Sequence, residues 1–128
     1  MIVGLGIDVV EIARIRRILD GPPALAERFL ARCFTAAEQS YCDAVVDRAT
    51  RYAARFAAKE AASKALGAPP GIGWHDVEVL RGEGAPSVAL RGAAAGAQAR
   101  LGATRALLSL THDAGIAAAV VVLEGGRS

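Results

Sequence analysis

Apolar and polar positions alternate along residues 2 to 10, and this pattern predicts a β-strand at the start of the chain. One face of the strand would hold large aliphatic residues, namely Val3, Leu5, Ile7 and Val9. The opposite face would hold Ile2, Gly4, Gly6, Asp8 and Val10. Glycine within a strand indicates either close approach by a ligand or tight packing against a neighbouring element. The sequence leaves both interpretations open.

The spacing of apolar residues after this strand predicts a run of helices. These helices are expected over residues 11–19, 24–32, 35–46 and 48–66. Thr35 is a suitable N-cap for the third helix, and Glu38 is placed as its capping-box partner. Gly67, followed by two prolines, forms a stop signal for the fourth and longest helix.

The second half of the chain reads as two hairpins separated by an alanine-rich helix. The expected strands are 77–80, 87–90, 105–111 and 116–124, and the expected helix is 92–101. This order of elements predicts an α+β fold with a mostly antiparallel sheet packed on a long helix. The chain length predicts a single domain over residues 1–128.

Amino-acid composition and net charge limit the classes of protein to which this chain could belong. Alanine supplies much of the 53% hydrophobic content and aromatic residues only 5%, so the core should be thin and association with further copies is expected. A net charge of +2 gives no reason to expect a nucleic-acid partner. Without an apolar run of about 18 residues, no membrane span is expected. Cys33 and Cys42 suggest reduced thiols in a cytoplasmic protein.

Phe56, Glu60 and Lys64 follow one another at intervals of four, so they should share one face of the longest helix. The simplest interpretation is a surface ion pair between Glu60 and Lys64, worth roughly 0.3–0.5 kcal/mol. The small residues around these charges favour instead a face that a bulky ligand approaches. If the first strand packs beside this face, Asp8 and Glu60 would offer two oxygen ligands suited to Mg²⁺ and a bound phosphate.

Two further features suit an anionic ligand or partner. Basic residues gather at Arg14, Arg16, Arg17, Arg28 and Arg32, and again at Arg48, Arg51 and Arg55. Such local basic patches attract phosphates or acidic proteins. His112 is expected in a turn between the last two strands, where it would either bond to local backbone or donate to a phosphate.

Three stretches of this sequence resemble the holo-acyl-carrier-protein synthases, the small bacterial 4′-phosphopantetheinyl transferases. The stretches are Gly6–Asp8 with Glu11 and Arg14, Arg55–Ala61 with Lys64 and Gly67, and Ser109–His112. The similarity follows nearly the whole chain in order. It implies an enzyme that moves phosphopantetheine from coenzyme A to a serine of an acyl carrier protein and releases adenosine 3′,5′-bisphosphate. It also implies dependence on Mg²⁺ and a homotrimer, with coenzyme A lying between two subunits.

The resemblance also implies roles for individual residues. Asp8 and Glu60 would bind the metal, and Lys64 would contact the pyrophosphate, so that these three residues form the catalytic group. The residues expected to bind coenzyme A are Arg55, Phe56, Lys64, Gly67 and His112. Arg14 and Arg28 would face acidic helices of the carrier protein.

Some alternatives stay open at this point. Glu60, acting through a metal-bound water, is the candidate base for the serine proton, while water alone or Asp8 could also serve. A non-catalytic coenzyme A or nucleotide-binding protein of the same fold would bind the ligand without forming the bisphosphate. In a structural or interaction protein, the basic face would bind an acidic partner and the two carboxylates would be ordinary surface charges.

Overall fold

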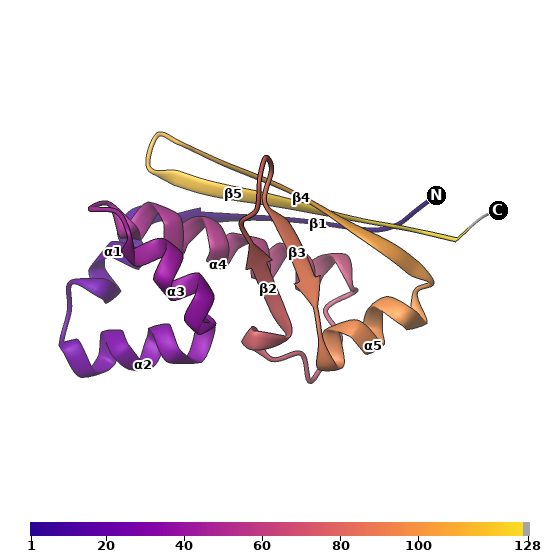
Figure 1. Ribbon diagram of the computed structural model, residues 1–128, viewed down its shortest axis with the longest axis horizontal. Coiled ribbons are helices and arrows are strands. Elements are labelled where there is room, and N and C mark those ends of the chain that lie inside the picture. Colours follow the sequence, from indigo (N-terminus) through magenta and orange to yellow (C-terminus); the bar gives the residue numbers. More distant parts are fainter. Residues whose placement is uncertain (127–128) are drawn as a thin grey trace.

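The computed structural model describes residues 1–126 and shows an α+β architecture (Figure 1). The elements are β1 (Ile2–Glu11), α1 (Ile12–Leu19), α2 (Pro23–Cys33), α3 (Ala36–Asp43), α4 (Arg48–Ala65), a 3₁₀ turn (Trp74–Asp76), β2 (Val77–Leu80), β3 (Ser87–Leu90), α5 (Gly92–Arg100), β4 (Ala103–Asp113) and β5 (Ile116–Gly125). The longest helix, α4, runs beneath the three long strands, and α1 to α3 gather at one end of the molecule.

The three long strands form an antiparallel sheet in the order β1-β5-β4, so β5 is the central strand. Asp8 on β1 and Leu110 on β4 both pair with Ala119 on β5. Strands β2 and β3 form a separate two-stranded antiparallel sheet. The antiparallel character predicted from the sequence is therefore present, although it is divided between two sheets.

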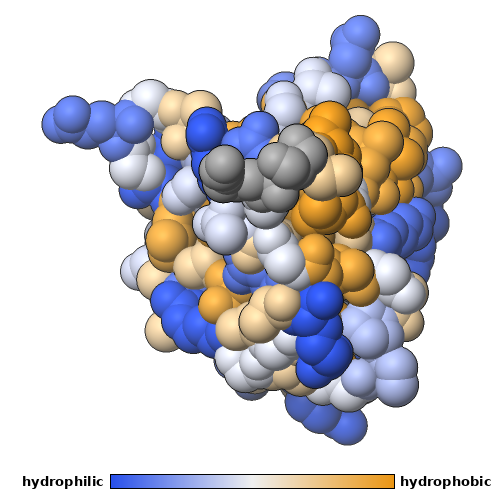
Figure 2. Space-filling view, turned by 90° about the vertical axis from the view of Figure 1, so that its right-hand side faces the viewer, coloured by the Kyte–Doolittle hydropathy of each residue, from blue (hydrophilic) through white to orange (hydrophobic). Residues whose placement is uncertain are grey.

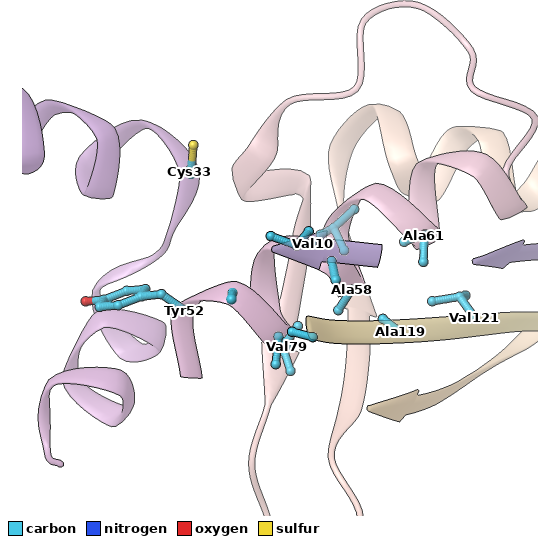
Figure 3. Packing of buried hydrophobic residues seen from close by; sticks show 14 of the residues in the cluster. Val10, Cys33, Tyr52, Ala58, Ala61, Val79, Ala119 and Val121 are labelled. Carbon is cyan, nitrogen blue, oxygen red and sulfur yellow. The ribbon is translucent and has the colours of Figure 1, made fainter. Parts of the chain in front are cut away.

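The core lies between α4 and one face of the three-stranded sheet. Figure 3 shows Ala58 and Ala61 of α4 close to Val10 of β1 and to Ala119 and Val121 of β5. All five side chains are buried. Because most of them are small, the helix can lie close to the sheet, and the alanine content predicted this thin core.

Gly4 and Gly6 mark the place where α4 comes closest to β1. A Cβ atom at Gly4 would overlap the carbonyl oxygen of Ala65, and one at Gly6 would overlap that of Ala61. A methyl group at Gly6 would also lie 2.6 Å from the backbone nitrogen of Ala65. Of the two interpretations left open by the sequence, the structure therefore supports tight packing against a neighbouring element.

The capping box expected at the third helix is confirmed. The Thr35 hydroxyl accepts a hydrogen bond from the Glu38 backbone N–H at 3.2 Å, and the Glu38 carboxylate accepts one from the Thr35 N–H at 2.8 Å. The helix ends at Asp43, earlier than the expected residue 46.

The placement of His112 in a turn was wrong. His112 lies on β4 and pairs with Ala117, and the turn itself is Ala114-Gly115. Both turn residues have positive φ, 51° and 79°. Two-residue turns of this kind continue the strands up to the turn, so the polar pair His112-Asp113 stays in the sheet although its composition suggested a loop.

The outer face of the sheet, opposite α4, is apolar and exposed. The β1 residues on it, Leu5, Ile7 and Val9, are between 58% and 63% exposed. They pair with the aliphatic residues Val122, Val120 and Ala118 of β5. Figure 2 shows a patch of apolar residues on the upper side of the molecule, where Figure 1 places this sheet. Patches of this kind usually form interfaces with another molecule.

None of the helices within residues 1–126 combines the length and the apolar character that crossing a bilayer requires.

Replacing Gly6 tests the close approach of α4 to β1. We expect Gly6→Ala to lower the free energy of unfolding by at least about 2 kcal/mol, because the helix must move away from the strand. Gly82→Ala is the matched control, since a Cβ atom there meets nothing within 4 Å. It should change stability by less than about 0.5 kcal/mol. Urea denaturation of both variants measures the difference, and equal stabilities would contradict this account of the packing.

Candidate functional site

The close packing of α4 on β1 brings Asp8 next to Lys64. The Lys64 ammonium donates to the Asp8 carboxylate at 3.1 Å and to the Ile7 carbonyl oxygen at 3.1 Å. The Asp8 side chain is 15% exposed and that of Lys64 is 53% exposed. Among the described residues, Lys64 forms no ion pair with Glu60. The simple interpretation of these charges as an ion pair within the helix is therefore wrong.

Glu60 lies close enough to Asp8 for their charges to interact. Burial raises the pKa of the Glu60 carboxyl, and the Asp8 carboxylate raises it further, while the positive charges of Lys64 and Arg14 act in the opposite direction. We call Asp8 and Glu60 the acidic pair. Because the Asp8 charge disfavours ionisation of Glu60, a bound cation would relieve the repulsion between the two carboxylates.

The donor set of the acidic pair fits Mg²⁺. Residues 1–126 contain no cluster of three or more His, Cys, Asp or Glu side chains suited to a metal. The protein would therefore supply two carboxylates, and water and phosphate oxygens would complete the coordination, as is usual for Mg²⁺. The Lys64 ammonium, which now binds Asp8, would then be free to turn toward a phosphate.

A hollow of about 180 Å³ adjoins Glu60, between α4 and the segment that precedes β2. We call it the Glu60 hollow, and it is lined by Lys59, Glu60, Ser63, Ile72, Gly73, Trp74 and Val77. It is partly apolar, and one member of the acidic pair, Glu60, lines it. This arrangement suits a ligand that has a charged end and a less polar extension.

Phe56 lies on the same side of α4 but in an adjacent cavity. Its ring packs against those of Trp74, 5.0 Å away, and Phe29, 6.1 Å away. These rings line a hollow of about 540 Å³, the aromatic hollow, together with Leu25, Arg28, Arg32 and Cys33. The Arg14 guanidinium lies 6.0 Å from the centre of the Phe56 ring. Arg14, Arg28 and Phe56 thus lie on the side of the molecule that holds Glu60.

Arg55 and His112 meet in a different cavity of about 310 Å³, the arginine hollow. Its lining residues are Tyr41, Thr50, Arg51, Ala54, Arg55, Arg81, Pro86, Leu110, Thr111 and His112. The guanidinium groups of Arg51 and Arg55 stack on the Tyr41 ring at 4.0 and 4.3 Å. Three arginines and no acidic residue line this hollow in the described part of the chain, which favours a phosphate-bearing ligand.

The predicted site residues therefore form two groups on different sides of the subunit. Arg55 and Glu60 are five positions apart on α4, which separates them by about 140° around the helix axis. Asp8 and His112 lie on the two outer strands of the sheet, with β5 between them. The acidic pair and the arginine hollow consequently flank α4 from opposite sides. Gly67, just beyond the end of α4, has a positive φ of 87°.

Comparison with known proteins identifies the family to which this chain belongs. The family model described as the 4′-phosphopantetheinyl transferase superfamily matches residues 4–121, which is most of the chain. The chain belongs to this superfamily. The family resemblance predicted from the sequence is thereby confirmed, and the chain is a transferase of the 4′-phosphopantetheinyl class.

Two curated relatives illustrate the similarity. The holo-[acyl-carrier-protein] synthase of Anaeromyxobacter sp. (strain Fw109-5) is 71% identical over 125 residues, covering 98% of this chain and 97% of that protein. The holo-[acyl-carrier-protein] synthase of Myxococcus xanthus (strain DK1622) is 57% identical over 121 residues, covering 94% of each.

Solved structures of the superfamily share the fold. The Helicobacter pylori holo-[acyl-carrier-protein] synthase in complex with coenzyme A matches with a TM-score of 0.79 and 32% identity, over 94% of this chain and 99% of that one. The Bacillus anthracis synthase in complex with coenzyme A (3′,5′-ADP) matches with a TM-score of 0.77 and 32% identity, over 98% and 99%.

Sequence reasoning missed three residues that the structure places at these cavities. Arg81 and Tyr41 line the arginine hollow, although neither belongs to a periodic basic pattern. Lys59 follows Arg55 by one helical turn, a spacing typical of surface charges, but Lys59 is buried and its ammonium pairs with the Glu38 carboxylate at 2.8 Å. The sequence pattern predicted the capping role of Glu38, whereas the ion pair between Glu38 and Lys59 depends on tertiary packing.

The raised pKa of Glu60 predicts a pH-dependent stability. The folded state holds the Glu60 proton more tightly than the unfolded chain does. Ionisation of Glu60 therefore lowers the stability of the folded state as the pH rises above 4.5, the ordinary pKa of a glutamate side chain. Glu60→Gln should therefore raise Tm at neutral pH, by of the order of 2 °C, and the difference should vanish below about pH 4.

Thermal unfolding with a metal chelator present, followed by circular dichroism across this pH range, makes the measurement. The control is Glu83→Gln at an exposed position in the β2–β3 turn, which should show no such pH-dependent gain. A lower Tm for Glu60→Gln at neutral pH would contradict the electrostatic account.

Proposed function

We propose that this chain transfers the 4′-phosphopantetheine group from coenzyme A to a serine hydroxyl of an apo acyl carrier protein, releasing adenosine 3′,5′-bisphosphate. The observation that carries the proposal is the acidic pair of Asp8 and Glu60 with the Lys64 ammonium beside it. Membership in the superfamily and the coenzyme A bound to its solved relatives support the same reaction.

The residues of the acidic pair suit chemistry on a diphosphate. A bound Mg²⁺ would withdraw negative charge from the diphosphate oxygens. Lys64 has a half-exposed side chain and can turn from Asp8 to the departing phosphate, where its positive charge stabilises the product. Catalysis of this kind consists mainly of positioning and electrostatic stabilisation.

The serine hydroxyl must also lose its proton. Glu60 is the candidate base, acting through a water. Its pKa is raised and therefore lies closer to neutral pH than the pKa of an ordinary carboxyl group. Water alone and Asp8 are the alternatives.

The arginine hollow is the proposed site for the remaining coenzyme A phosphate. Arg55, Arg51 and His112 supply donors there. Since α4 lies between this hollow and the acidic pair, we propose that each complete site combines the acidic pair of one subunit with the arginine hollow of its neighbour. Interfaces that join two different patches form a ring when the rotation between neighbouring subunits closes, and the family resemblance gives three as the number of subunits.

The apolar outer face of the sheet supports this association. Leu5, Ile7 and Val9 expose large aliphatic side chains beside the aliphatic face of β5. Burying them against other subunits would supply hydrophobic stabilisation that the alanine-rich core lacks.

Arg14 and Arg28 are the proposed contacts for acidic helices of the carrier protein. Both lie on the side of the molecule that holds Glu60, and the Arg14 charge acts on the Glu60 carboxyl. A carrier protein bound there would deliver its serine to the acidic pair. We place the reaction in the cytoplasm, where the free buried thiols of Cys33 and Cys42 would stay reduced.

Removing one member of the acidic pair tests the reaction. We expect Asp8→Ala to lower kcat/KM for transfer by about 100-fold or more, because electrostatic stabilisation of the reacting diphosphate is lost. The assay follows the mass gain of an apo carrier protein incubated with coenzyme A and Mg²⁺. Arg14→Glu is the contrasting variant, and it should raise KM for the carrier protein more than KM for coenzyme A.

Normal turnover by a folded Asp8→Ala variant would contradict the metal assignment. Binding of coenzyme A by the wild-type chain without any mass gain of several carrier proteins would favour the non-catalytic alternative.

Mixing two impaired variants tests the shared site. Asp8→Ala damages the acidic pair, and His112→Ala damages the arginine hollow. A ring that contains both variants therefore has some sites in which the acidic pair and the arginine hollow are both intact. Random mixing of equal amounts should restore about a quarter of the wild-type sites. Co-expression followed by the same transfer assay measures the recovery. Activity no greater than the average of the two separate variants would show that each subunit holds a complete site by itself.

A further inference from the structure

Lys59 precedes Glu60 in the sequence, yet its side chain is fully enclosed. Lys59 is 3% exposed and Glu38 is 1% exposed. The Lys59 ammonium pairs with the Glu38 carboxylate at 2.8 Å. It also donates to the carbonyl oxygens of Trp74 at 2.9 Å and Val77 at 2.5 Å. All three donor positions of the ammonium are therefore used.

The Glu38 carboxylate is equally well satisfied. Its two oxygens accept hydrogen bonds from the backbone N–H groups of Thr35 and Val79, each at 2.8 Å. No buried side-chain nitrogen or oxygen lacks a partner within residues 1–126. A buried ion pair is often no more stabilising than a well-packed apolar pair. Stability alone therefore does not explain this ion pair. Its role is better inferred from the backbone groups that Lys59 binds.

Lys59 holds residues 72–77, which we call the wall segment. This segment forms one side of the Glu60 hollow, and α4 forms the other side with Glu60 and Ser63. Among the described residues, the two bonds from Lys59 are the only hydrogen bonds that join the wall segment to α4. Lys59 thus ties the wall segment to α4 across the Glu60 hollow.

The aromatic rings extend this effect. Trp74 of the wall segment packs against Phe56 of α4, with ring centres 5.0 Å apart and an angle of 30° between the ring planes. Phe56 and Glu60 lie one turn apart on the same face of α4. A shift of the wall segment would therefore alter both the Glu60 hollow and the aromatic hollow next to it.

We propose that Lys59, held by Glu38, is a positioning residue that fixes the wall segment to receive the arm of coenzyme A next to the diphosphate. The inference rests on the proposed function, which puts the diphosphate at the acidic pair. Beyond the phosphate, this arm bears two methyl groups, a hydroxyl and an amide. The Glu60 hollow offers the apolar side chains of Ile72 and Val77 together with the Ser63 hydroxyl, which match this mixed character.

The test compares two ligands that share the adenosine 3′,5′-bisphosphate part and differ in the arm and in the phosphate that carries it. Coenzyme A has the arm, and adenosine 3′,5′-bisphosphate lacks it. The double variant Lys59→Met/Glu38→Gln removes both charges together, so no unpaired charge is left in the core. With Mg²⁺ present, calorimetry should show affinity for coenzyme A reduced about 10-fold or more, as expected for a misplaced binding group. Affinity for the bisphosphate should change less than about two-fold.

Fluorescence reports the wall segment directly, because Trp74 is the only tryptophan in the chain. In the double variant, acrylamide should quench Trp74 more strongly than in the wild-type chain. Tyr52→Phe is the control, since it removes a hydrogen bond between Tyr52 and Asp43 at 3.0 Å that does not touch the wall segment. It should leave both the quenching and the ratio of the two affinities unchanged.

A second variant covers the case in which the double variant fails to fold. Ser63→Leu fills the Glu60 hollow from α4, at a partly exposed position, and leaves the Lys59–Glu38 pair intact. It should also weaken binding of coenzyme A without weakening binding of the bisphosphate.

The possible results distinguish failure of the inference about Lys59 from failure of the proposed function. Equal loss of affinity for both ligands in either variant, or no loss for either ligand, would overturn this inference. If the wild-type chain bound neither ligand, the proposed function would fail and the inference would fall with it.

Discussion

The contact between the backbone of α4 and strand β1 is the constraint on which the rest of the structure depends. It exists because Gly4 and Gly6 leave room for the carbonyl oxygens of Ala65 and Ala61. The same approach brings Asp8, two residues beyond Gly6, within reach of Lys64 and close to Glu60. The glycines of the first motif therefore act through packing, and the position of the acidic pair is a consequence of that packing.

The helix that forms this contact also separates the two halves of the candidate site. Glu60 and Lys64 lie on the β1 side of α4, while Arg55 lies on the side of β4, where it meets His112. A single straight helix cannot present both groups to one small cavity. This separation is the basis of the proposed site shared between neighbours, and the apolar outer face of the sheet is the surface proposed for their association.

Two lysines of α4 form ion pairs with other elements, and these pairs differ in burial. The difference in burial suits them to different roles. The Lys64–Asp8 pair is partly exposed, so exchanging Asp8 for a phosphate oxygen costs Lys64 little desolvation. The Lys59–Glu38 pair is enclosed and fully bonded, so breaking it would leave an uncompensated charge in the core. The first pair can rearrange when a ligand arrives, whereas the second holds its neighbours in fixed positions.

The sequence by itself determined what depends on local spacing. Alternation, capping and stop signals gave the elements, as with the Thr35–Glu38 box and the end of α4 near Gly67, and short motifs gave the family. Only the tertiary structure decided that Lys64 pairs with Asp8, that Lys59 is buried against Glu38, and that Arg55 meets His112 in one cavity. These contacts join residues distant in the chain, and the depth at which helices pack on the sheet sets them. Residue spacing within one element carries no information about that depth.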